Sequence, residues 1–132
     1  MSMLEGLLKP TRIVHAHCDL PCGVYDPAQA RIEAESVKAC QEKFAASDDP
    51  VFRERAIAIK EERANMVKEH LWVLWTDYFK PEHLERFPEL HDKFWTATKL
   101  AGAAKKSEDP AQGQELLNAI DEISKIFWDT KS

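Results

Sequence analysis

The sequence predicts an all-α protein: an antiparallel four-helix bundle preceded by a non-helical N-terminal segment. Three observations favour this fold. The 132 residues fit a single domain. Apolar residues recur at helical spacing after Pro27, Pro50, Pro88 and Pro110. No stretch combines alternating polarity with β-branched residues, as a strand would. Four helices with short connections form an antiparallel bundle.

Asp-Pro pairs mark the starts of the helices. Asp26-Pro27 and Asp109-Pro110 are each followed by Ala and Gln, which makes Asp the N-cap and Pro the first helical residue; Asp49-Pro50 is a third such start. Pro81 is expected to end the second helix, and Lys105-Lys106 the third. The residues expected to face the core are Ala30, Ala34, Val37, Cys40 or Gln41, and Phe44 in the first helix; Phe52, Ala56, Ile59, Met66, Val67, Leu71, Leu74 and Tyr78 in the second; Leu90, Phe94, Ala97, Ala101 and Ala104 in the third; and Leu116, Ile120, Ile123 and Phe127 in the fourth.

Composition and charge exclude several classes of protein. Hydrophobic residues make up 44% of the chain and glycines number only four, which excludes a disordered tail or a collagen-like chain. The net charge is −5, without a dense Lys/Arg block, so we expect neither nucleic acid nor a membrane as partner. The longest uncharged apolar run, Leu71–Thr76, is too short to span a bilayer.

Two charged residues share the apolar stripes, Glu33 in the first helix and Arg63 in the second. Long side chains at the margin of a stripe commonly reach out to solvent. Alternatively, the two residues pair with each other beneath the N-terminal segment, where a buried pair would orient another group. The pattern alone leaves both interpretations open.

Residues 1–16 differ in character from the rest of the chain. Glu5, Lys9, Pro10 and Arg12 interrupt every apolar stretch that a secretory signal would need. The segment is therefore either a flexible N-terminus or a short leader that is removed for a chemical reason. Without a secretory signal, the cytoplasm is the expected compartment, and thiols stay reduced there.

The residues that carry chemistry follow directly, in the run His-Cys-Asp-Leu-Pro-Cys-Gly-Val-Tyr-Asp-Pro from 17 to 27. Cys18 and Cys22 stand four residues apart, and Pro21 and Gly23 favour a turn that lets both sulfurs approach one centre. The spacing is compatible with half a zinc site, a redox dithiol or no function. Backbone nitrogens could also join the two thiolates in a plane, a geometry suited to Cu(II) or Ni(II). A chain that began at His17 would add its α-amine.

This run resembles the nickel-binding hook of the nickel superoxide dismutases. The similarity continues at residues 28–39, 74–75, 77–81, 88–91 and 126–128. The resemblance implies a homohexamer of four-helix bundles with one nickel ion per subunit. It also implies an enzyme that converts superoxide to dioxygen and hydrogen peroxide by Ni(III)/Ni(II) cycling. The alternative is a non-catalytic nickel or zinc carrier, which would bind metal through the same cysteines.

The resemblance further implies a division of the chain. Residues 1–16 would be a leader that a dedicated protease cuts between Ala16 and His17. Residues 17–132 would form the mature domain, with the hook at 17–25 and the bundle at 26–132. Cys40 is not part of the family's site and is most simply a small buried apolar residue.

By position, the resemblance assigns roles to individual residues. The ligands would be the α-amine and imidazole of His17, the amide nitrogen and thiolate of Cys18, and the thiolate of Cys22. Glu33 would hydrogen-bond the His17 imidazole, with Arg63 holding Glu33. The residues implied in substrate access and proton delivery are Asp19, Tyr25, Tyr78 and Lys80. Asp19 would shape the hook, and Tyr25 and Tyr78 would border the open axial face. Lys80 would attract the anionic substrate.

Overall fold

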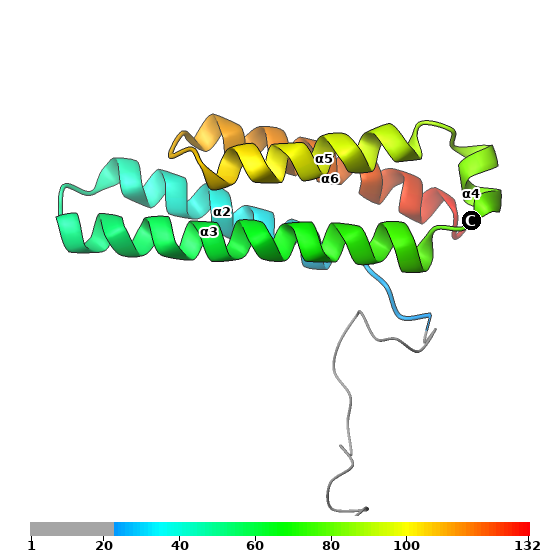
Figure 1. The fold of residues 1–132 in the computed structure, drawn as a ribbon, viewed down its shortest axis with the longest axis horizontal. Coiled ribbons are helices and arrows are strands. Elements are labelled where there is room, and N and C mark those ends of the chain that lie inside the picture. The colour runs from blue at the N-terminus through cyan, green and yellow to red at the C-terminus, as the bar shows by residue number, and fades with distance from the viewer. Residues whose placement is uncertain (1–22) are drawn as a thin grey trace, which may run out of the picture.

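The computed structural model describes residues 23–132, and all regular structure within that range is helical. The elements are α2 (Ala28–Ala46), α3 (Pro50–Val73), the π-helical turn η1 (Leu74–Tyr78), α4 (Pro81–Arg86), α5 (Leu90–Lys105) and α6 (Pro110–Asp129). The hairpin of α2 and α3 packs on the hairpin of α5 and α6, which confirms the antiparallel four-helix bundle (Figure 1). None of the helices in this range is long and apolar enough to cross a membrane.

Each Asp-Pro pair starts a helix, as predicted. The Asp carboxylate accepts a hydrogen bond from the backbone N–H two residues later, at 2.9 Å for Asp26, 3.1 Å for Asp49 and 2.9 Å for Asp109. This bond satisfies one of the N–H groups that the first helical turn leaves without a partner. The first helix begins at Ala28, one residue later than predicted.

The core confirms the predicted stripes of α5 and α6 in full. In α2 the buried position is Gln41, whereas Cys40 is half-buried. The prediction for α3 is partly wrong, because Phe52 and Ile59 are 39% and 38% exposed. The buried residues of α3 are Ala56, Lys60, Ala64, Val67 and Leu71.

Lys60 and Gln41 are buried because the turn between α5 and α6 gives them partners. The Lys60 ammonium donates to the Ser107 carbonyl and to the Glu108 carboxylate, both at 2.9 Å. The Gln41 amide donates to the same Ser107 carbonyl at 2.9 Å and to the Ala104 carbonyl at 3.2 Å. Buried polar groups are normally hydrogen-bonded in this way. Both hairpins are therefore tied together at the end of the bundle away from α4.

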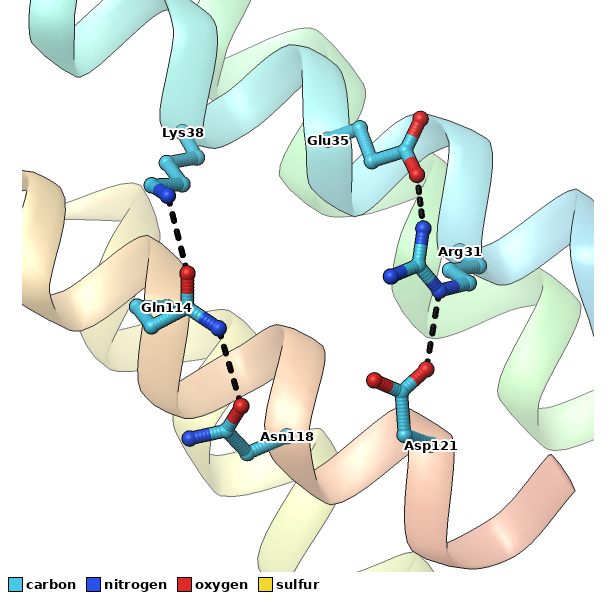
Figure 2. Close-up of polar contacts among 6 residues, drawn as sticks. All are labelled: Arg31, Glu35, Lys38, Gln114, Asn118 and Asp121. Carbon is cyan, nitrogen blue, oxygen red and sulfur yellow. Dashed lines mark hydrogen bonds and ion pairs between the residues drawn. The ribbon is translucent and has the colours of Figure 1, made fainter. Parts of the chain in front are cut away.

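A polar network joins the exposed edges of α2 and α6 (Figure 2). Arg31 contacts Glu35, one turn further along α2, and its Nε lies 2.8 Å from the Asp121 carboxylate. Lys38 donates to the Gln114 side chain at 2.8 Å. These contacts occupy the side of α2 that faces α6, which leaves Glu33 on the side that faces α3.

The segment between α3 and α5 differs from the prediction of a plain helix end. In η1 the Phe79 N–H bonds to the Leu74 carbonyl at 3.1 Å, which widens the last turn. The short helix α4 then follows Pro81 and was not predicted. It has six residues and buries none of them, so apolar periodicity gives no signal for it.

Candidate active site

The structure describes five of the predicted site residues: Tyr25, Glu33, Arg63, Tyr78 and Lys80. The other five, Ala16, His17, Cys18, Asp19 and Cys22, lie outside the described residues. Gly23 is the first described residue and has a φ of 75°, which glycine adopts without steric cost. Among residues 23–132 no three His, Cys, Asp or Glu side chains gather to hold a metal ion.

A cavity of about 330 Å³ lies where residues 23–25, η1, α4 and the C-terminal end of the chain meet. Its lining residues are Gly23, Tyr25, Asp77, Tyr78, Lys80, Glu82, His83, Thr130 and Lys131. The cavity thus brings together three predicted residues, Tyr25, Tyr78 and Lys80. Gly23, which also lines it, follows Cys22 directly in the chain.

Aromatic contacts hold the Tyr78 ring in place. Its centroid lies 4.4 Å from that of Phe127 and 5.0 Å from that of Phe79. The His83 ring stacks on it at 5.6 Å and is parallel to within 9°. The Tyr25 ring tilts against it at 5.7 Å. Such offset and edge contacts are the favoured arrangements of aromatic rings, so the position of the phenol is fixed from several sides.

Polar contacts complete the cavity wall. The Tyr78 hydroxyl lies 2.6 Å from the Thr130 hydroxyl, and the Lys131 ammonium lies 5.0 Å from the centre of the Tyr78 ring. The His83 Nδ1 accepts a hydrogen bond from the Lys80 backbone N–H at 3.0 Å. A neutral His83 therefore carries its proton on Nε2.

Sequence reasoning missed five residues of this wall: Asp77, Glu82, His83, Thr130 and Lys131. His83 had a local signal, because a polar residue three positions after a helix N-cap can accept the hydrogen bond of the N-cap N–H. Thr130 and Lys131 had none. They reach the cavity only because the bundle returns the end of α6 to η1.

Glu33 and Arg63 form an ion pair, with Arg63 Nη1 at 3.1 and 3.4 Å from the two carboxylate oxygens. The Glu33 side chain is 14% exposed and that of Arg63 is 36% exposed. The Arg63 guanidinium also lies 3.5 Å from the sulfur of Met66. Of the two arrangements that the sequence left open, the structure shows the pair. The expected contact of Glu33 with His17 involves a residue outside the described range.

Cys40 lies in α2, half-buried. Burial raises the pKa of its thiol above the ordinary value, and the positive charges of Arg63, Lys43 and Lys60 only partly offset this effect. A thiol with a raised pKa is a weak nucleophile at neutral pH.

Comparison with known proteins identifies the relatives of this chain. A family model described as nickel-containing superoxide dismutase matches residues 12–131. The curated "Superoxide dismutase [Ni]" of Streptomyces coelicolor is 61% identical over 129 residues, and that of Streptomyces seoulensis is 63% identical over 129 residues. Each match covers 98% of this chain and 98% of the relative.

The fold agrees with a solved structure of this kind. The native nickel superoxide dismutase at 1.30 Å superposes with a TM-score of 0.86 and 63% sequence identity, covering 88% of this chain and 100% of that one. The family match spans most of the chain, and the relatives match along almost their whole length. This chain therefore belongs to the nickel-containing superoxide dismutase family.

Proposed function

We propose that this protein disproportionates superoxide to dioxygen and hydrogen peroxide, with one nickel ion per subunit held by the hook of residues 17–25. Family membership is the basis of the proposal. The structural observation that supports it most directly is the cavity beside Gly23, which brings Tyr25 from the N-terminal segment next to Tyr78 at the end of η1 and Lys80 in the connection between η1 and α4. Because Gly23 is joined to Cys22, a metal held by Cys22 would lie at the edge of this cavity.

The residues of the hook fit nickel by their chemistry. The donors would be the α-amine and imidazole of His17, the backbone nitrogen and thiolate of Cys18, and the thiolate of Cys22. Nitrogen donors in a tetragonal arrangement suit Ni(II), and thiolates donate the electron density that a higher oxidation state needs. When bound, nickel supplies one-electron oxidation and one-electron reduction by cycling between Ni(III) and Ni(II).

Solved relatives support these positions. Structures described as nickel superoxide dismutase include variants in which a histidine, an aspartate and a tyrosine are each replaced. The three replaced residues are spaced as His17, Asp19 and Tyr25 are in this chain. We propose that Asp19 shapes the hook and that Tyr25 and Tyr78 restrict the cavity to small molecules.

The remaining residues would position the ligands and the substrate. Arg63 holds the Glu33 carboxylate, which would accept a hydrogen bond from the His17 imidazole and fix its orientation. Lys80 and Lys131 place positive charge at the cavity for the anionic substrate. Asp77 and Glu82 line the same cavity and balance that charge.

We propose that removal of residues 1–16 activates the enzyme. While Ala16 is attached, the His17 nitrogen is an amide and cannot serve as an amine ligand. The extent of the solved relative supports a cut before His17. It matches 88% of 132 residues, about 116, which is the length of segment 17–132. We assign the cut to a dedicated protease, and we place the enzyme in the cytoplasm, since both ligand thiols must stay reduced.

We further propose a homohexamer. Three of the four tryptophans, Trp72, Trp95 and Trp128, are 49%, 59% and 51% exposed on the single chain. Tryptophan is enriched in interfaces between proteins relative to the rest of the surface, so we assign these side chains to contacts between subunits.

Native mass spectrometry and a superoxide assay test the proposal together. The chain is co-produced with nickel and the leader protease. We expect hexamers of subunits that begin at His17, each with one nickel ion, and dismutation that is lost in Cys18→Ser and Cys22→Ser. Cys40→Ser is the matched control and should keep both nickel and activity. Processed hexamers that bind nickel or zinc without dismutation would instead support a metal carrier.

A further inference from the structure

The hydrogen bonds at the C-terminal end of α6 fix which way the Tyr78 hydroxyl proton points. The Phe127 carbonyl can only accept, and the Thr130 hydroxyl donates to it at 2.5 Å. A threonine hydroxyl has one proton, which is therefore already in use. The Tyr78 oxygen lies 2.6 Å from the Thr130 oxygen, so in this contact Tyr78 donates and Thr130 accepts.

This direction determines what Tyr78 presents to the cavity. Its single proton points to Thr130, so the phenol oxygen can only accept further hydrogen bonds. The ring cannot turn away, because Phe127 and His83 pack against it. Tyr78 and Thr130 both line the cavity of about 330 Å³.

We propose that Thr130 is a positioning residue for the dismutation: it takes the Tyr78 proton and thereby makes Tyr78 a hydrogen-bond acceptor toward the cavity. This inference rests on the proposed function. An acceptor binds molecules that carry an O–H group, namely water and the hydrogen peroxide product. It repels superoxide, an anion without a proton. The ammonium groups of Lys80 and Lys131 attract the superoxide anion. The protons that convert it to hydrogen peroxide arrive through the hydrogen-bonded molecules that Tyr78 orients.

The first test reads the hydrogen bond without using activity. The chain has only two tyrosines, so Tyr25→Phe leaves Tyr78 as the sole source of the tyrosine Raman doublet. The intensity ratio of this doublet reports whether the phenol donates or accepts. In the full-length chain we expect the ratio of a phenol that both donates and accepts. Adding Thr130→Val should shift this ratio toward that of a phenol that only accepts, whereas adding Thr130→Ser should leave it unchanged. A ratio that Thr130→Val leaves unchanged would overturn the inference.

The second test is a double-mutant cycle in the processed, nickel-loaded enzyme. Loss of one hydrogen bond predicts that Thr130→Val lowers kcat/KM about three- to tenfold. Thr130→Ser should retain the wild-type value. In a Tyr78→Phe background, Thr130→Val should have no further effect, because the proton that Thr130 directs is already absent. Nickel content and the Ni(III) EPR spectrum should stay unchanged, which would show that the site is assembled.

The two tests separate the inference from the proposed function. An equal loss in both backgrounds would mean that Thr130 acts only through structure, and the inference would be wrong. An inactive wild-type enzyme whose Raman ratio still depends on Thr130 would contradict the dismutase function and leave the hydrogen-bond assignment standing.

Discussion

Arg63 pairs with the charge of the Glu33 carboxylate, which is largely removed from water because the Glu33 side chain is only 14% exposed. Removing one partner of a buried pair leaves the other without its hydrogen bonds. We expect Arg63→Met to lower the free energy of unfolding by about 1–3 kcal/mol. Urea unfolding with an unchanged m-value measures this. Lys93→Met breaks the exposed Lys93–Glu122 pair, 2.8 Å apart, and should cost less than about 1 kcal/mol. Equal losses in the two variants would contradict the argument.

Glu33 itself tests the role proposed for this pair at the metal. Glu33→Ala removes the acceptor expected for the His17 imidazole and leaves the other ligands in place. We expect nickel to remain bound, activity to fall by about 10- to 100-fold, and the Ni(III) EPR spectrum to change. An unchanged spectrum with unchanged activity would exclude this contact.

Cys40 tests the electrostatics of the interface between α2 and α3. Burial raises the pKa of its thiol, so at any pH below that pKa it carries less thiolate than a free cysteine. We expect alkylation of Cys40 to be slower in the folded chain than in urea. The pH at which its rate reaches half of the maximum should also be higher. Mass spectrometry of the Cys40 peptide between about pH 7 and pH 10 measures both. Equal pH profiles in the folded and unfolded chains would contradict the shift.

The close crossing of α2 and α6 depends on Gly113. A Cβ at this position would lie 2.5 Å from Gln41 Oε1 and 2.9 Å from the Lys38 Cα. The backbone atom cannot move aside, and Gln41 is buried with its amide bound to the turn between α5 and α6. Alanine ordinarily stabilises a helix by about 1 kcal/mol relative to glycine. Here the clash outweighs that gain, because overpacking a core costs about 1–3 kcal/mol.

We therefore expect Gly113→Ala to lower the melting temperature. Gly102→Ala in α5 is the matched control, since its Cβ would meet only the Lys68 side chain, at 3.4 Å. That change should leave stability unchanged or raise it by up to about 1 kcal/mol. Thermal unfolding followed by circular dichroism compares the two. A Gly113→Ala protein as stable as Gly102→Ala would show that the helices can separate at little cost.

The helices could be predicted from the sequence wherever apolar spacing agrees with burial. The stripes of α5 and α6 were confirmed for this reason. In α3 the spacing placed Ile59 toward the core, whereas Lys60 is buried there by its bond to Ser107, a residue 47 positions away. Local pattern carries no information about such a partner. The site shows the same limit: the family resemblance predicted Tyr78 and Lys80, but only the fold brings Thr130 and Lys131 beside them.

The charge of the whole molecule opposes its substrate, because a chain with a net charge of −5 repels an anion. Salt screens distant charges beyond about 8–10 Å, so the charges that line the cavity dominate the final approach. Lys80 and Lys131 there are balanced by Asp77 and Glu82. Removing one of these positive charges should therefore make the local potential more negative, and removing one of the negative charges should make it more positive. A unit charge about 8 Å away in water contributes about 0.5 kcal/mol, or roughly a twofold change in encounter rate.

We accordingly expect Lys80→Met to lower kcat/KM about twofold at low salt and Glu82→Gln to raise it by a similar factor. Both differences should shrink as salt is added, because screening removes the long-range part of the attraction. Stopped-flow or pulse-radiolysis rates over a range of ionic strength measure these slopes. Effects that persist at high salt would mean that these side chains act by direct contact with the reacting molecules. If Glu82→Gln instead lowered the rate, electrostatic steering by the cavity charges would be excluded, since a weaker negative potential cannot slow an anion.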